Sequence, residues 1–224
     1  MLRLTLAVAR KDLLLTLARG NGLVQALLLG FLLFFVFSLS QGIGEHTSPQ
    51  GAATIFWLSS TFCHVLIFSQ LYALEEVNNA RLGLLLLPAP IQAVWLGKSI
   101  AGFSLLLMAQ AVFLPVAIVF LGQNLSGALL PALLILLLVD TGLCALGSLL
   151  GALQGQGARE SLMSIVLFPL LVPLLLAGIS VGSQAFGTLS PDGPGMWLKL
   201  ACAFDAVFLA AGLLLFGFLY AGDE

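Results

Sequence analysis

Six long runs of apolar residues follow one another along this chain, separated by short polar segments. A helix needs about 20 apolar residues to cross a lipid bilayer. The predicted spans cover residues 23–40, 52–74, 93–121, 128–153, 161–186 and 197–220. The runs do not alternate apolar and polar residues, as the strands of a membrane β-barrel do. The pattern predicts an all-α polytopic membrane protein, with residues 1–224 forming a single transmembrane domain.

The first 20 residues have a different pattern, because charged and apolar positions are mixed there. Five apolar residues recur at helical spacing: Leu2, Leu6, Ala9, Leu13 and Leu17. Charged residues interrupt them, which argues against the apolar core of a signal peptide. We therefore expect an amphipathic helix over residues 1–20, lying in the membrane interface before the first span.

The most polar stretch lies between the second and third predicted spans. It contains Glu75, Glu76, Asn78, Asn79 and Arg81. Because a charged side chain at the centre of a bilayer costs about 2.5–3.5 kcal/mol, this stretch must lie in water or against a partner. It is either a polar turn after a fraying helix end, or a short amphipathic helix across the mouth of two spans. In the second case Glu75 and Glu76 fall in the first turn, where the helix dipole favours them.

The basic residues predict the orientation of the chain. One side of the membrane receives the N-terminal helix, the loops of Arg81 and Arg159, and the C-terminus. Trp95 and Lys98 are predicted to anchor the start of the third span at the membrane surface on that side. The positive-inside rule then places both termini and the polar stretch in the cytoplasm.

Composition agrees with a membrane protein and argues against an enzyme. Hydrophobic residues make up 60% of the chain and charged residues 8%, whereas soluble domains carry about 25% charged residues. The three cysteines are not spaced as a zinc site or a disulfide framework. The chain has no Walker A, HExxH or GxSxG motif. We expect a non-catalytic membrane protein without a bound cofactor or a nucleic-acid partner, so that any energy source or enzyme it needs lies in another protein.

Three polar side chains inside the predicted spans are candidates for function: His64, Asp140 and Asp205. An intramembrane carboxylate such as Asp140 faces a substrate path, pairs with a polar group on another span, or is a protonated acid bonded to a serine or threonine hydroxyl. Asp205 could pair with Lys199 or extend to the interface. His64 could ligate haem iron, although a lone histidine in an apolar helix is more often a packing residue.

Two further patterns concern helix packing. Glycines at 142, 147 and 151 give the fourth span a face of small residues, which favours close helix contacts. Pro169 and Pro173 predict a bent or broken fifth span, because proline removes a helical hydrogen bond.

The chain resembles a known family over essentially its whole length, and three segments carry the most specific part of this resemblance. They are the acidic stretch leading into Leu84-Leu85-Leu86-Leu87-Pro88 with Lys98 beyond it, the run Phe168-Pro169-Leu170-Leu171-Val172-Pro173-Leu174-Leu175, and Phe204-Asp205 in the last span. The chain resembles the permeases of type-2 ABC exporters and, more closely, CcmB, the haem exporter B permease of cytochrome c maturation.

The resemblance implies that the loop after the second span is a cytoplasmic coupling helix that docks on an ATPase. The residues that would carry this role are Glu75, Glu76, Asn78, Asn79, Arg81, Leu82, Leu85 and Pro88. The family usually has a glycine and then a Leu-acid pair before the leucine run, where this chain has Ala80-Arg81-Leu82-Gly83. The docking contacts are therefore expected to differ in detail. Asp140 also falls where the family pattern has a small or apolar residue.

The function implied by this resemblance is that of a permease subunit for haem export or haem delivery in c-type cytochrome biogenesis. It would lie in the bacterial inner membrane as a homodimer, with a CcmA-like ATPase and with CcmC- and CcmD-like membrane proteins. Haem would be the transported or handled ligand. Other hypotheses are a type-2 permease for another substrate, a non-transporting membrane scaffold of a haem-handling complex, and an intramembrane enzyme that uses Asp140.

Overall fold

The computed structural model describes residues 1–40, 47–77, 83, 84, 86, 90–153, 158–187 and 193–221. The elements of this part of the chain are all helices: α1 (Leu2–Arg19), α2 (Asn21–Ser40), α3 (Pro49–Val77), α5 (Gln92–Phe120), α6 (Leu129–Ala152), α7 (Ala158–Ala185) and α8 (Gly195–Ala221). The all-α prediction is confirmed for these residues.

The predicted spans coincide with α2, α3, α5, α6, α7 and α8 to within three residues at each end. Among the described residues, α2, α3, α5, α6 and α8 are long and apolar enough to cross a membrane. In α7 the part whose side chains are described is an apolar helical stretch over Pro169–Ala185. A polytopic membrane protein is therefore supported, while the sixth crossing stays a prediction.

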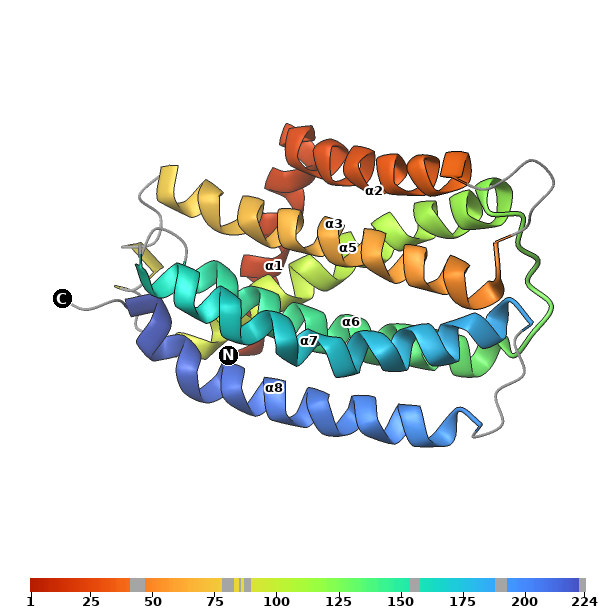
Figure 1. Ribbon diagram of the computed structural model, residues 1–224. Coiled ribbons are helices and arrows are strands. Elements are labelled where there is room, and N and C mark those ends of the chain that lie inside the picture. The colour runs from red at the N-terminus through yellow and green to blue at the C-terminus, as the bar shows by residue number, and fades with distance from the viewer. Residues whose placement is uncertain are drawn as a thin grey trace.

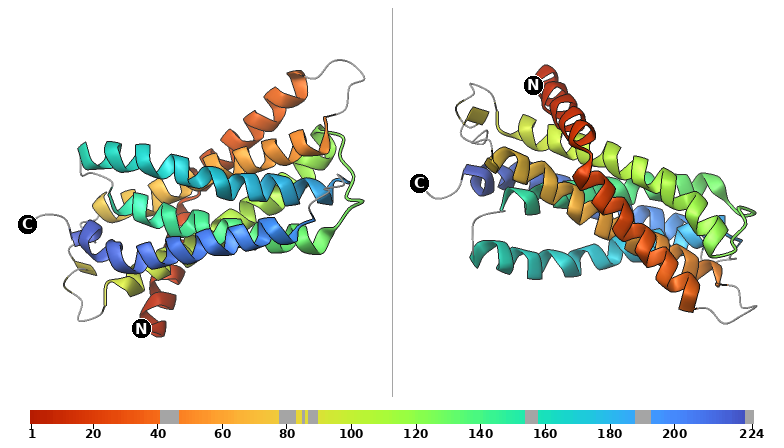
Figure 2. Two further views of the ribbon diagram at one scale, coloured as in Figure 1. Left: turned by 60° about the horizontal axis from the view of Figure 1, so that its bottom comes forward. Right: turned by 90° about the horizontal axis from the view of Figure 1, so that it is seen from above.

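The long helices run side by side, and α6 lies among them (Figure 1). It packs against α3, α5, α7 and α8, whereas α2 lies on the outside against α3 and α5. The end of α3, the start of α5, the end of α6 and the C-terminal end of α8 all meet at one end of the bundle (Figures 1 and 2). This is the arrangement that the predicted orientation requires, although the structure contains no membrane to test it.

Helix α1 crosses the bundle at a steep angle and packs on α5 (Figures 1 and 2). Its buried face consists of Thr5, Val8, Ala9, Asp12 and Thr16. Most of the predicted leucine stripe points outward instead, since the side chains of Leu2, Leu6 and Leu17 are exposed. This crosswise helix has apolar side chains available for lipid, but its place in the membrane interface stays a prediction.

Glycines bring the neighbours of α6 into close contact, as the small-residue face predicted. A Cβ atom at Gly147 would meet the ring of His64, and one at Gly151 would meet the ring of Tyr72, both from α3. A Cβ atom at Gly142 would meet Asp205 of α8. Each glycine therefore leaves the space that a larger side chain of the next helix fills.

Of the two predictions for the fifth span, bent or broken, the break is wrong and the bend stays a prediction. The structure has one helix from Ala158 to Ala185 with Pro169 and Pro173 inside it. Neighbouring helices can support a helix where a proline has removed a hydrogen bond, and α7 packs against α3, α6 and α8.

Alanine at Gly147 or Gly151 is expected to destabilise the bundle by about 1–3 kcal/mol, because the added methyl group overpacks a filled contact. The apparent melting temperature of the detergent-solubilised protein measures this. Gly195→Ala is the control, since a Cβ atom there meets nothing within 4 Å. An equal loss in all three variants would contradict the close packing described for α6.

Candidate functional site

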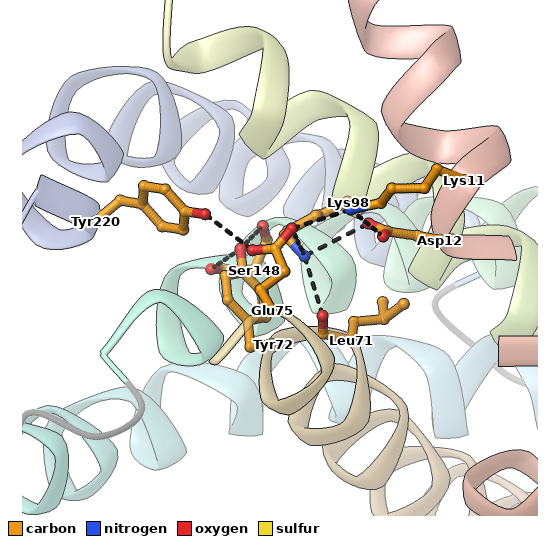
Figure 3. Close-up of polar contacts among 8 residues, drawn as sticks. All are labelled: Lys11, Asp12, Leu71, Tyr72, Glu75, Lys98, Ser148 and Tyr220. Carbon is orange, nitrogen blue, oxygen red and sulfur yellow. Dashed lines mark hydrogen bonds and ion pairs between the residues drawn. The ribbon is translucent and has the colours of Figure 1, made fainter. Parts of the chain in front are cut away.

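Four charged side chains meet where α1, α3 and α5 come together, and we call them the charge cluster: Lys11, Asp12, Glu75 and Lys98 (Figure 3). Lys98 is completely buried and lies at the centre. Its Nζ is 2.9 Å from Glu75 Oε1 and 3.4 Å from Asp12 Oδ2. It also donates a hydrogen bond of 3.1 Å to the backbone carbonyl of Leu71. Three oxygen atoms thus compensate the buried ammonium group.

Lys11 completes the cluster from its open side, with a side chain that is 40% exposed. Its Nζ is 2.9 Å from Asp12 Oδ1 and 3.2 Å from Glu75 Oε1. Burial by itself lowers the pKa of Lys11, but the carboxylates of Asp12 and Glu75 outweigh this effect and raise the pKa above its ordinary value. A raised folded-state pKa means that this lysine stabilises the fold at neutral pH and stops doing so only in strong alkali. Two cations and two carboxylates leave the cluster without net charge.

Two tyrosines extend the cluster toward α6 and α8 (Figure 3). The hydroxyl of Tyr220 donates a hydrogen bond of 2.8 Å to Glu75 Oε2. The Lys98 ammonium group lies 4.3 Å from the ring centroid of Tyr72, a cation–π distance. The Tyr72 hydroxyl lies 2.8 Å from the Ser148 carbonyl and 2.7 Å from its Oγ. Side chains from five helices are therefore joined at this end of the bundle.

Glu75 lies in the last turn of α3, so its predicted place in the first turn of a short helix is wrong. Both of its oxygens are used, Oε1 by the two lysines and Oε2 by Tyr220. These contacts compensate a carboxylate that would otherwise be unfavourable near the negative end of the helix dipole. The backbone of Glu76 also belongs to α3.

The other predicted docking positions lie outside the described part of the chain. They are the side chain of Glu76 and residues Asn78, Asn79, Arg81, Leu82, Leu85 and Pro88. Docking on an ATPase through residues 75–90 therefore remains a prediction. The structure adds that Glu75, the first of these residues, is 4% exposed and part of the charge cluster.

Sequence reasoning did not find the charge cluster. It predicted Lys98 and Trp95 as surface anchors, which is wrong because both side chains are 0% exposed between helices. It also did not foresee the burial of Asp12. A signal was present, since acids and lysines of opposite charge recur at the same predicted side of the membrane. The sequence does not show that α1 packs across α5 and brings Asp12 close to Lys98.

Asp140 pairs with another span, which was one of its predicted alternatives. Its Oδ1 accepts a hydrogen bond of 2.8 Å from Gln110 Nε2, and both residues are buried between α5 and α6. The predicted serine or threonine partner is wrong, because the donor is an amide. This contact joins two helices near their middle and indicates a structural role for the carboxyl group.

The two predicted environments of Asp205 are both wrong. Its side chain is buried, so it does not extend to the interface. Its oxygens have no hydrogen-bond partner in the described part of the chain, and Lys199 does not pair with it. The helical phase of α8 turns Asp205 toward α6, where Gly142 leaves space for the carboxyl group.

His64 is enclosed as a packing residue would be. It is 1% exposed, its ring centroid lies 4.9 Å from that of Phe68, and it faces Gly147. Among the described residues, no group of three or more histidine, cysteine, aspartate or glutamate side chains could hold a metal ion. The site with the most extensive polar contacts described here is therefore the charge cluster, and its arrangement suits mechanical connection rather than catalysis.

We expect Lys98→Met to lower the free energy of unfolding by about 3–5 kcal/mol, because it leaves buried carboxylates without their central cation. The double variant Lys98→Met/Glu75→Gln should recover most of this loss. It retains the Lys11–Asp12 pair, and the glutamine can still accept a hydrogen bond from Tyr220. Chemical denaturation in mixed micelles gives both values.

The exposed Lys199, on α8 at the other end of the bundle, supplies the control, and Lys199→Met should change little. If the double variant were as unstable as the sum of its single variants, Lys98 and Glu75 would be energetically independent and the cluster would not act as a unit.

Comparison with known proteins gives one family. A family model described as "CcmB protein" matches residues 3–219, a region that contains all four members of the charge cluster. No curated protein matches the chain.

Proposed function

This chain belongs to the CcmB family, the membrane component of an ABC-type haem-export system in cytochrome c maturation, and we propose that it is the permease subunit through which a separate ATPase drives haem export or delivery. The family match over residues 3–219 is the observation that carries this proposal. Members of this family are generally non-catalytic membrane subunits of a complex that includes an ATPase and other membrane proteins.

The polar segment after α3 is the proposed ATPase contact, and the charge cluster is the proposed connection between that contact and the membrane helices. Glu75 lies in the last turn of α3, directly before the segment. It is paired with Lys98 of α5 and bonded to Tyr220 of α8. Because separating buried partners is costly, a displacement of the segment would move the ends of these helices together.

The proposed orientation places this end of the bundle in the cytoplasm. Its support is the predicted excess of basic residues on this side, together with the gathering of the end of α3, the start of α5, the end of α6 and the start of α7 at one end (Figure 1). The helices would then cross the bacterial inner membrane with both termini on the ATPase side.

The proposed assembly is a homodimer of this chain with a CcmA-like ATPase and with CcmC- and CcmD-like membrane proteins. Haem would either pass along the subunit or be released from a partner that the complex remodels. A scaffold that moves no substrate is the competing hypothesis. It differs in requiring no contact between residues 75–90 and an ATPase.

The first test is purification of the detergent-solubilised protein from native membranes, followed by identification of its partners by mass spectrometry. An ATPase recovered together with haem-handling membrane proteins is the expected result. Recovery of an ATPase without haem-handling membrane proteins would support the role as a permease but contradict the assignment to a haem pathway. Absence of any ATPase would contradict the proposed coupling.

Arg81→Glu should then reduce the recovered ATPase by about tenfold, a loss equivalent to 1.4 kcal/mol of binding, because it reverses a charge in the proposed contact. Lys199→Glu reverses a charge at the opposite end of the bundle and should leave recovery unchanged. Reversal of Glu75 is unsuitable for this test. It would break the charge cluster, and a loss of ATPase binding would then report on the fold of this end of the bundle as well as on docking. Equal recovery for Arg81→Glu and the wild type would exclude this residue from docking.

A further inference from the structure

A carboxyl group and an amide are bonded to each other in the middle of the bundle, at Asp140 of α6 and Gln110 of α5. Gln110 Nε2 donates a hydrogen bond of 2.8 Å to Asp140 Oδ1. Asp140 is 0% exposed and Gln110 is 2% exposed. In the described part of the chain, the second atom of each group, Asp140 Oδ2 and Gln110 Oε1, has no hydrogen-bond partner. If the carboxyl group carries no proton, both of these atoms are acceptors, and neither can satisfy the other.

This pair lies at the depth where a charge is least tolerated. With a rise of 1.5 Å per residue, Asp140 is about 17 Å from the start of α6, and Gln110 is about 15 Å from the end of α5. Half of the hydrocarbon core of a bilayer measures about 15 Å. Both side chains therefore lie near the centre of the bilayer, where an ionised carboxylate is costly and lipid supplies no hydrogen-bond donor.

No cation is paired with Asp140 among the described side chains. Cys144, one turn further along α6, interacts electrostatically with Asp140 but is a thiol. Lys98, the one basic residue of α5, is about 18 Å from Gln110 along the helix and is held in the charge cluster. The described side chains of α7 include no charged residue. Titratable side chains of α3 and α8 face other positions of α6, namely His64 at Gly147 and Asp205 at Gly142. Within this part of the chain, a proton is the remaining way to neutralise the carboxyl group.

We propose that Asp140 is a proton-binding site, in which a proton on Oδ2 forms a second hydrogen bond to Gln110 Oε1. A neutral carboxyl group has one donor and one acceptor, and so does the facing edge of an amide. Rotation of the two planar groups into one plane brings Oδ2 opposite Oε1 and closes a ring of two hydrogen bonds. Both unpaired acceptors are then satisfied without a charge, and the contact between α5 and α6 depends on a bound proton. This site requires only the contact between α5 and α6 and is independent of the proposed transport function.

The test is infrared spectroscopy of the full chain in lipid nanodiscs at neutral pH, because the carbonyl stretch of a neutral carboxylic acid is separate from the bands of carboxylates and amides. The difference between the wild type and Asp140→Asn should show the loss of one such acid band. Asparagine is expected to keep the fold, since its amide donates to Gln110 Oε1 and accepts from Nε2. The matched control is Asp205→Asn, which removes another buried acid of the spans and should leave the Asp140 band in place. Loss of a carboxylate band in Asp140→Asn, in place of an acid band, would overturn the proposal.

A second variant tests the two hydrogen bonds and keeps Asp140 itself. Gln110→Met has a side chain of similar length without an amide. The acid band of Asp140 should persist in this variant and shift to higher frequency, because a carbonyl stretch rises when its group loses hydrogen bonds. An acid band that Gln110→Met leaves at the same frequency would contradict the pairing with Gln110. So would a melting temperature of Asp140→Asn far below that of the wild type, since asparagine retains both hydrogen bonds.

Discussion

The buried ammonium group of Lys98 is the interaction on which the ends of the helices depend. An uncompensated cation could not be tolerated at a fully buried position, and the structure surrounds this one with Glu75, Asp12, the Leu71 carbonyl and the face of Tyr72. Each partner comes from α1 or α3, whereas Lys98 comes from α5. One side chain therefore connects both α1 and the end of α3 to α5. Electrostatic compensation acts here together with apolar packing, since Val8 of α1 lies against Gly97 of α5.

Apolar contacts determine the rest of the bundle, because small residues on one helix lie opposite large side chains on the next. Helix α6 supplies glycines where α3 and α8 supply large side chains, so the helices come close without a hydrophobic driving force from water. The Asp140–Gln110 hydrogen bond adds one directional contact between α5 and α6. A core of this kind is specific because each large side chain has one place that can receive it.

The helices could be predicted from the sequence because bilayer thickness imposes a length on every apolar run. Sequence periodicity also predicted the small-residue face of α6, and it predicted that the N-terminal residues form a helix separate from the first span. It failed for Lys98, Asp12 and Asp205, and the failures share a cause. Periodicity shows which residues lie on one face of a helix, but not which other helix that face meets. Asp12, one partner of Lys98, lies 86 residues away from it in the sequence. The helix α7 continues through its two prolines for a similar reason, because support from neighbouring helices is a tertiary property.

The full engagement of Glu75 has a consequence for the direction in which force could travel. Both carboxylate oxygens already have partners in Lys11, Lys98 and Tyr220, and Glu75 is only 4% exposed, so a protein bound to the segment after α3 has little access to this side chain. Glu75 belongs to the membrane domain, and the gripping surface can begin only after it. If an ATPase docks on the segment after α3, as proposed, Glu75 passes the motion on to α5 and α8 through its contacts with Lys98 and Tyr220 without being a docking residue itself.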